Sequence, residues 1–402
     1  MPMANNNDKK VLNVPALRFP EFSGEWKSKF INDLASVVGG GTPDTSVKSF
    51  WDGNIQWFTP SEIGKNKYVD SSLRTITEEG LNNSSAKLLP PHTILLSSRA
   101  TVGECSLSLK ECATNQGFQS LIAQSCDTNF LYYLIQTKKK DLIRKACGST
   151  FLEISANEVR KIQVKIPYDN EQKKIADFLS LIDERIFTQN KIIEDLKKLK
   201  SAIVEMLLCN QSGESFKLGD VGCFVRGLTY ANEDVTENKA ATIVIRANNL
   251  NYGSHVDKRE VVYVNKTPTV SQILRKGDIV ICMANGSSAL VGKNSYYPFN
   301  DRQSTIGAFC GIYRTSNPLV KWLMQSQRYK RQVYQSLQGG NGAIANLNGD
   351  DILNMSFPLI EKEKSQSIIF TIEAIEKSLV ANKYLHRLYY TQKSYLLKQM
   401  FI

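Results

Sequence analysis

Two stretches of the chain carry the same helical pattern, and this repeat constrains the fold more than any other feature. In each stretch, apolar residues recur at alternating intervals of four and three positions, the spacing of a heptad seam. Adding 193 to every position of the first seam gives the second, and the polar interruptions coincide, since Gln189 falls on Asn382 and Lys200 on Lys393. The first seam is Ile175, Leu179, Ile182, Ile186, Gln189, Ile193, Leu196, Ile203 and Leu207, and the second is Ile368, Ile372, Ile375, Leu379, Asn382, His386, Tyr389, Leu396 and Met400. The chain therefore contains a duplicated frame.

Two helices with the same seam are expected to pack together and bury it. At 1.5 Å per residue, each helix would be about 50 Å long. We expect an antiparallel pair in which Gln189 faces His386. Buried polar groups on such a seam commonly fix its register. The alternative, that these side chains lean to the edge of the seam, is equally compatible with the sequence.

The segments that precede the two helices also correspond. Residues 26–43 resemble residues 216–229, and residues 88–103 resemble residues 273–292. Short apolar runs between turn residues in these segments indicate buried strands. The predicted fold class is α+β: two mixed α/β domains, each followed by a long helix, with the helices packed as an antiparallel coiled coil and the halves forming a pseudo-twofold internal repeat. The predicted segments are a flexible arm at 1–20, a first domain at 21–167, its helix at 168–210, a second domain at 211–358 and its helix at 359–402.

The composition favours a soluble protein with a polyanionic partner. The net charge is +11, and the second half is the more basic. No apolar run approaches the roughly 18 residues of a membrane helix, and the polar N-terminus lacks a signal-peptide core. We expect a cytoplasmic location and no membrane partner. The eight cysteines include no C-x-x-C pair and the three histidines lie far apart, so a metal site is not indicated.

Sequence motifs for catalysis are missing. The chain contains neither the N-P-P-(Y/F) or D-P-P-(Y/F) loop of adenine methyltransferases nor the G-x-x-x-x-G-K-(S/T) phosphate loop. The glycines at 39–41 lack the G-x-G-x-x-G order of a cofactor loop. Asp169 and Glu171 do not indicate a nuclease site, because acidic residues are common in the first turn of a helix. We therefore expect a non-enzymatic protein that binds no cofactor itself.

Several motifs resemble those of type I restriction-modification specificity subunits. Residues 39–63 read G-G-G-T-P-D-T-S-V-K-S-F-W-D-G-N-I-Q-W-F-T-P-S-E-I, which is similar to the opening of a target recognition domain in that family. Further similar motifs are V-P-A-L-R-F-P-E-F-S-G-E-W (14–26), S-S-R-A-T-V-G (97–103), T-N-Q-G-F (114–118) and E-Q-K-K-I-A-D-F-L-S-L-I-D (171–183). The second half resembles a different recognition-domain type through L-R-K-G-D-I-V-I-C-M-A-N-G-S (274–287). Because it lacks the G-G-T-P and W-x-T-P elements, the two halves are expected to read different DNA sequences.

The resemblance implies a function and partners. A specificity subunit reads a bipartite, asymmetric target in double-stranded DNA, with the helices setting the spacer. It binds two methyltransferase (modification) subunits, which methylate adenine with S-adenosylmethionine, and restriction/translocase subunits, which use ATP and Mg²⁺. Phe178, Phe187 and Tyr390 lie off the seam and are candidate contacts to the methyltransferases, although packing within the chain explains each of them as well. The alternative function is a non-enzymatic DNA-binding regulator or architectural protein with a duplicated reader.

Base edges are read by side chains that donate and accept hydrogen bonds in pairs, as Arg does to guanine and Asn or Gln to adenine. Side chains of this kind lie in the motif loops of both halves. For each one, a structural role competes with base contact, and for Trp57 core packing is the stronger alternative. The candidates are Trp57, Thr59, Ser61, Arg99, Asn115 and Gln116 in the first half and Arg246, Asn248, Asn285, Arg302 and Gln303 in the second.

Overall fold

The computed structural model describes residues 13–148, 152–209, 213–301, 303–338 and 345–402. They form two compact units. The first unit contains the chain up to Ile192 together with Asn382–Ile402, and the second unit is Ile193–Ala381. The predicted segments end each domain at its own helix, whereas each compact unit takes in part of both long helices. Each unit contains segments of both helices because the two helices bury their seam against each other.

The first unit is built on two small sheets. The larger has the strand order β2 (Ala35–Gly39), β9 (Gln119–Ala123), β6 (Ile94–Leu96), β7 (Cys105–Ser108) and β4 (Tyr68–Val69). The smaller has the order β5 (Arg74–Ile76), β3 (Trp51–Phe58) and β8 (Cys112–Thr114), with β3 and β8 parallel. A separate antiparallel pair joins β1 (Lys27–Phe30) to β10 (Gln163–Ile166). The short helices are α1 (Ile31–Leu34), α2 (Glu78–Asn82), α3 (Thr128–Thr137), α4 (Lys139–Lys145) and α5 (Ala156–Arg160).

The second unit has a related topology, with four strands in each of its two main sheets. One sheet has the order β12 (Gly222–Arg226), β20 (Cys310–Thr315), β16 (Ile279–Cys282) and β18 (Asn294–Tyr296), and the other β13 (Val235–Thr236), β15 (Val262–Val264), β14 (Thr242–Ile245) and β19 (Ser304–Ile306). The pair β14–β19 is parallel, as β3–β8 is in the first unit. The pairs β11 (Ser215–Lys217) with β22 (Ser356–Pro358) and β17 (Ala284–Asn285) with β21 (Ala345–Asn346) complete the strands. The short helices are α7 (Leu218–Val221), α8 (Val320–Leu323), α9 (Gln327–Gln338) and α10 (Gly349–Leu353).

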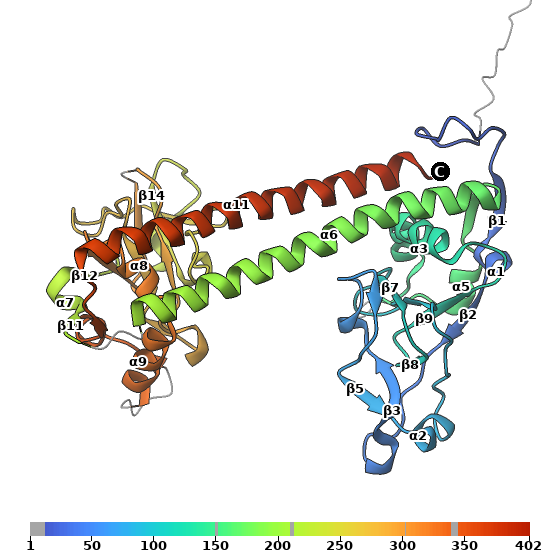
Figure 1. The fold of residues 1–402 in the computed structure, drawn as a ribbon, viewed down its shortest axis with the longest axis horizontal. Coiled ribbons are helices and arrows are strands. Elements are labelled where there is room, and N and C mark those ends of the chain that lie inside the picture. The colour runs from blue at the N-terminus through green and yellow to red at the C-terminus, as the bar shows by residue number, and fades with distance from the viewer. Residues whose placement is uncertain (1–12, 149–151, 210–212, 302, 339–344) are drawn as a thin grey trace, which may run out of the picture. The chain divides into compact units, whose positions relative to one another are not determined.

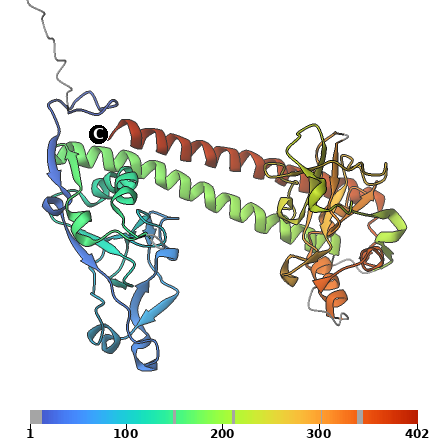
Figure 2. The same cartoon turned by 180° about the vertical axis from the view of Figure 1, so that it is seen from behind.

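The two long helices are α6 (Asp169–Val204), which continues as a π-helical turn over Glu205–Cys209, and α11 (Lys362–Gln399). They lie side by side in Figures 1 and 2. In the first unit Asp183 pairs with Lys393 and Gln189 with Asn382, so residues that advance along α6 meet residues that go back along α11 and the helices are antiparallel. Lys200 of α6 pairs with Glu376 of α11 in the second unit. The seam residues of both helices are buried or half-buried. The mixed α/β domains, the long helices and their antiparallel packing confirm the predicted fold class.

The ion pairs Asp183–Lys393 and Lys200–Glu376 lie within one residue of the predicted register, but the hydrogen-bond partner of Gln189 differs from the prediction by one helical turn. Its side-chain amide donates to Asn382 Oδ1 at 2.5 Å, whereas His386 was the expected neighbour. The imidazole of His386 packs edge-on against Tyr390, with 4.8 Å between ring centroids. The Gln189 amide thus has an acceptor inside the seam, whereas His386 Nε2 is buried without a hydrogen-bond partner among the described residues.

Each unit has its own hydrophobic core, which includes parts of both long helices. In the first unit, Trp26 and Phe130 pack with Leu396, Met400 and Phe401 from the end of α11 and the residues after it. In the second, Trp322 and Phe357 pack with Leu208, which follows α6, and with Ile368 and Ile372 of α11. No helix of the described residues is both long enough and apolar enough to cross a membrane.

Candidate DNA-recognition loops

Three of the motif loops meet at one end of the sheets of the first unit. The Gly41 amide donates to the Thr114 carbonyl at 2.8 Å, and the Asn115 amide donates to the Phe58 carbonyl at 3.1 Å. The Trp57 indole N–H donates to the Gly41 carbonyl at 2.9 Å. The G-G-G-T-P, W-F-T-P-S and T-N-Q-G segments therefore form one loop cluster.

Glycine is required where these loops approach each other. A Cβ on Gly40 would lie 2.0 Å from the Asn115 carbonyl oxygen, and one on Gly41 would lie 2.3 Å from the Ala86 amide nitrogen. Neither distance leaves room for a side chain. These glycines therefore serve the packing of the loop cluster.

Some of the predicted reading residues of the first unit hold the loops in place. Trp57 is 4% exposed and packs edge-on against Trp51, so in this structure it has no free face for a base. The Thr59 amide and hydroxyl both donate to Glu62 Oε2 at 2.7 Å, which caps the turn over Pro60–Glu62. Asn115 Oδ1 accepts from the Gly117 amide at 2.9 Å.

Other candidates of the first unit are open to solvent. Ser61 and Gln116 are exposed, and Gln116 accepts a hydrogen bond from the Thr42 hydroxyl. Arg99 is also exposed and lies beside the cluster, because the Ser98 amide donates to the Gly117 carbonyl at 2.7 Å. Its guanidinium pairs with Glu153 at 2.8 Å. That pair orients Arg99 and would have to rearrange for a two-point contact with guanine.

The second unit builds the same loop cluster from different residues. The Leu228 amide donates to the Ile306 carbonyl at 2.8 Å, and the Gly307 amide donates to the Ile245 carbonyl at 2.9 Å. The turn over Ala247–Asn249 has the place of the turn over Pro60–Glu62, and it is capped in the same way, since the Arg246 amide donates to Asn249 Oδ1 at 2.9 Å. The second half thus lacks the T-P-S-E residues but keeps their backbone geometry.

The predicted residues of the second unit are mostly accessible. Arg246, Asn248 and Gln303 are exposed. Asn285 is half-buried, and its Oδ1 accepts from the Ser287 amide at 3.0 Å. Arg302 lies outside the described residues.

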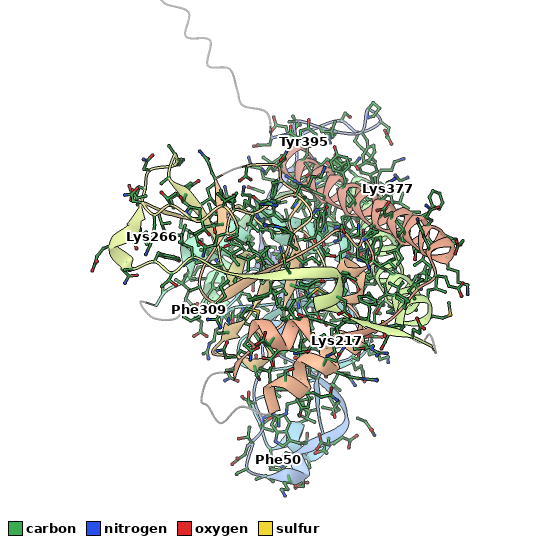
Figure 3. The ribbon with its side chains drawn as sticks, turned by 90° about the vertical axis from the view of Figure 1, so that its left-hand side faces the viewer. Phe50, Lys217, Lys266, Phe309, Lys377 and Tyr395 are labelled. Atoms are coloured by element: carbon green, nitrogen blue, oxygen red, sulfur yellow. The ribbon has the colours of Figure 1, made fainter. Side chains whose placement is uncertain are left out.

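An exposed aromatic side chain in this cluster was not among the predicted residues. Phe309 is 71% exposed (Figure 3), and its carbonyl accepts from the Met283 amide at 2.8 Å, as the Gly117 carbonyl does from Ser98 in the first unit. It therefore lies at the position of Gly117 among the loops. The I-G-A-F-C run carries no sequence signal for exposure, because alternating apolar residues there also fit a strand.

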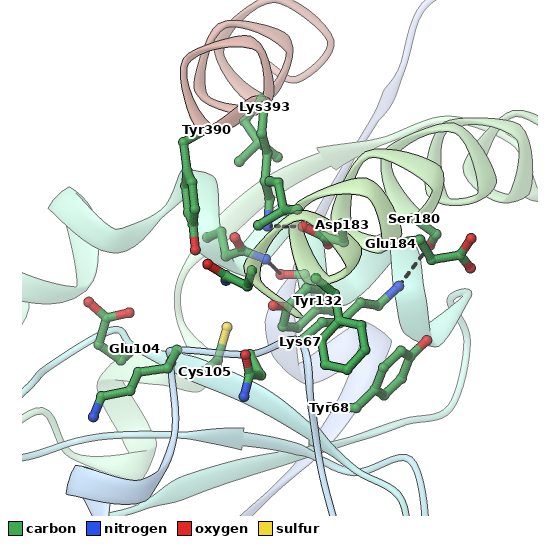
Figure 4. A pocket seen from close by; sticks show the side chains of 18 of the residues that line it. Lys67, Tyr68, Glu104, Cys105, Tyr132, Ser180, Asp183, Glu184, Tyr390 and Lys393 are labelled. Carbon is green, nitrogen blue, oxygen red and sulfur yellow. Dashed lines mark hydrogen bonds and ion pairs between the residues drawn. The ribbon is translucent and has the colours of Figure 1, made fainter. Parts of the chain in front are cut away.

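A pocket of about 750 Å³ lies in the first unit, between the domain that carries the loop cluster and the two long helices (Figure 4). Its lining includes Lys67, Asp183 and Lys393, with Cys105 and the exposed aromatic residues Phe187 and Tyr390. Burial raises the pKa of the Cys105 thiol to about 12, which keeps it protonated.

Of the three candidate contacts to a methyltransferase, Phe187 and Tyr390 are accessible, while Phe178 is partly buried against Phe19. No group of three or more metal-ligating side chains gathers among the described residues.

The half-buried Lys67 should make the stability of the first unit depend on pH. Burial lowers the pKa of its ammonium group from 10.5 to about 8. Between these values the unfolded chain binds more protons than the folded one, so the contribution of Lys67 to the free energy of unfolding rises with pH. We expect the free energy of unfolding of wild type to rise relative to that of Lys67→Met between pH 8 and pH 10 in chemical denaturation. A constant difference would contradict the lowered pKa.

The comparisons with known proteins agree with this architecture. Residues 23–198 match the family model of the type I restriction modification DNA specificity domain. The MjaIX specificity subunit of Methanocaldococcus jannaschii is 36% identical over 180 residues, and the EcoR124I/EcoR124II specificity subunit of Escherichia coli is 30% identical over 190 residues. These alignments cover 44% and 45% of the chain and only 42% and 46% of the relatives. The MjaVIII specificity subunit of M. jannaschii is 22% identical over 390 residues, covering 90% of the chain and 87% of the relative.

Solved structures share the fold along the chain. The S subunit of a type I restriction-modification system from M. genitalium aligns with a TM-score of 0.55 and 16% identity over 97% of this chain and 99% of that one. A chain from a structural study of complex assembly in the type I system aligns with a TM-score of 0.57 and 13% identity over 94% and 97%. Residues 23–198 thus form a DNA specificity domain. The chain is thus similar to type I restriction-modification specificity subunits, in sequence over its first half and in fold along most of its length.

Proposed function

We propose that the chain reads a bipartite, asymmetric sequence in double-stranded DNA. The observation that carries this proposal is the loop cluster, which is built twice on the same backbone pattern and bears different exposed side chains. The first cluster offers Ser61, Arg99 and Gln116, and the second offers Arg246, Asn248 and Gln303. Two readers with different donor and acceptor groups recognise two different half-sites. The positive net charge supports binding to the phosphates on either side.

The proposal extends to the partners. As a specificity subunit, the chain would direct two methyltransferase subunits and the restriction/translocase subunits to the target while carrying out no chemistry itself. S-adenosylmethionine, ATP and Mg²⁺ would be bound by those partners, and the complex would act in the cytoplasm. The exposed Phe187 and Tyr390 in the first unit are candidate docking points for a methyltransferase subunit.

Mapping of methylated adenines across the genome tests this function. Cells that contain the chain and its methyltransferase partners should carry methylation at one motif made of two different half-sites separated by a fixed unspecified spacer. Deletion of the gene for this chain should remove methylation at that motif and at no other. Methylation that persists without the chain, or a motif that is a continuous palindrome, would contradict the proposed function.

Phe309 gives a test at the level of one residue. We expect Phe309→Ala to weaken binding of the assembled complex to its target by about 1–3 kcal/mol, because an exposed aromatic ring among the reading loops stacks on bases or contacts a thymine methyl group. The folded stability should not change, since the ring is exposed. Phe370→Ala is the matched control, because Phe370 is 76% exposed on α11, outside the loop cluster. Equal DNA affinities of the two variants, measured at fixed salt, would remove Phe309 from the interface.

A further inference from the structure

The same polar junction occurs in each unit, at the point where the recognition domain meets the two long helices. In the first unit the centre of the junction is Asp183 of α6 (Figure 4). Its Oδ2 accepts from the Tyr133 hydroxyl of α3 at 2.6 Å, and its Oδ1 lies 2.7 Å from Lys393 Nζ of α11. One carboxylate therefore ties together the recognition domain, the helix that follows it and the other helix.

In the second unit the centre is Glu376 of α11. Its Oε1 accepts from the Trp322 indole N–H of α8 at 3.0 Å and lies 2.6 Å from Lys200 Nζ of α6. Glu376 follows Asp183 by the same 193 residues that separate Lys393 from Lys200 and Asn382 from Gln189. The two junctions thus have the same design with the roles of the helices exchanged, and they explain why both seams contain a lysine.

Each junction is closed by further polar groups of its own unit. Lys67 donates to Ser180 Oγ at 2.7 Å and to the Tyr133 hydroxyl at 3.2 Å. Lys200 donates in addition to Gln325 Oε1 at 2.9 Å. Burial alone would raise the pKa of Glu376, but Lys200 and Trp322 outweigh burial and lower the pKa of this carboxyl overall. The Glu376 carboxyl is therefore held in the charged form that pairs with Lys200.

Stability alone gives no reason for these junctions. The side chains of Asp183, Lys393 and Lys200 are only 12%, 13% and 13% exposed, so their charges lose much of their hydration. Apolar residues of similar size are often as stable or more stable at such positions. A charged junction of three side chains depends on direction. Its hydrogen bond and ion pair form in one placement of the recognition domain on the helices and break in neighbouring placements.

We propose that the Tyr133–Asp183–Lys393 and Trp322–Glu376–Lys200 junctions are positioning sites that fix each recognition domain on the helix pair and thereby restrict the DNA spacer. This inference rests on the proposed reading of a bipartite target. One added base pair rotates a half-site by about 35° and moves it by about 3.4 Å. A domain locked to its helices cannot follow that change, whereas a domain freed at its junction can tilt to meet it.

The test uses the chain assembled with its methyltransferase subunits and a set of duplexes that differ only in spacer length. Wild type should prefer one spacer over those one base pair shorter or longer by about tenfold, the usual cost of one mismatched base pair. In Asp183→Asn with Lys393→Met, which leaves no unpaired charge between the two helices, this preference should fall to about threefold or less. Binding to a duplex with only one half-site should stay the same.

Three further variants separate positioning from a structural role. Asp183→Glu keeps a carboxylate at the junction, as Glu376 does in the second unit, so this variant should retain the wild-type spacer preference. Glu194→Gln with Lys197→Met removes a solvent-exposed pair on α6, 2.7 Å long, and should change nothing. Glu376→Gln with Lys200→Met should relax the preference as the first double variant does.

An unchanged spacer preference in both junction variants would overturn the proposal, even if their thermal stability falls. Failure of the proposed function gives a different result, because wild type would then show no bipartite target and no preferred spacer. Loss of half-site binding in the junction variants would also overturn the proposal, because it would mean that the junctions shape the reading loops themselves.

Discussion

Replacing Phe401 with alanine is expected to lower the free energy of unfolding of the first unit by about 3–5 kcal/mol, the usual cost of removing a buried phenylalanine ring. Phe401 is 7% exposed, and its ring centroid lies 5.3 Å from that of Phe130 and 6.2 Å from that of Trp26. These neighbours belong to the first recognition domain, far from Phe401 in sequence. The residues that follow α11 therefore complete the core of the first unit.

Hydrogen exchange followed by mass spectrometry separates the effect on the two units. In Phe401→Ala, exchange should accelerate in β6 and β9 of the first unit and stay the same in β16 and β20 of the second. Tyr395→Ala is the control from the last turns of α11, since Tyr395 is 59% exposed and its loss should cost little. Equal acceleration in both units, or none, would contradict the assignment of Phe401 to the first core.

The second large effect is expected for Asp278→Ala in the second unit, also about 3–5 kcal/mol. Asp278 is 1% exposed and accepts from Arg314 Nε at 2.8 Å and from a second guanidinium nitrogen at 2.7 Å. Its Oδ2 also accepts from the Arg275 amide at 2.7 Å. The alanine variant leaves Arg314 without its acidic partner in a site where the Arg314 side chain is only 18% exposed.

Unfolding should then begin in β16 and β20, the strands that contain or follow these residues, with the first unit unaffected. Asp278→Ala with Arg314→Met should recover much of the lost stability, because no buried charge remains unpaired. Asp257→Ala is the surface control: its partner Arg259 is 88% exposed, so the loss of this pair should change the stability little. A double variant no more stable than the single one would mean that Asp278 acts through its backbone contact and not through the ion pair.

The helical frame could be predicted from the sequence because its signal is periodic and repeated. The predicted helix segments 168–210 and 359–402 contain α6 and α11, and the short apolar runs at Ile94–Leu96 and Ile279–Cys282 are strands β6 and β16. The pairing of Gln189 could not be predicted as reliably. A heptad pattern says which face of a helix is buried, but it does not say which residue across the seam a long polar side chain will bind.

The geometry of the loop clusters could not be predicted from sequence patterns. T-P-S-E at 59–62 and R-A-N-N at 246–249 share no residue, yet both are turns capped by a side-chain oxygen three residues later. The parallel pairs β3–β8 and β14–β19, which bring the loops together, join segments far apart in the chain. Neither relation leaves a local pattern, so the burial of Trp57 and the exposure of Phe309 emerged only from the folded chain.

Selection from a random duplex library by the assembled complex tests most directly whether the chain is a double reader. We expect wild type to select two different half-sites at one fixed separation. Ser61→Ala with Gln116→Ala should relax base preference in one half-site only, and Asn248→Ala with Gln303→Ala in the other only. A single uninterrupted motif, or loop variants of both units that alter the same bases, would contradict two independent readers on one duplicated frame.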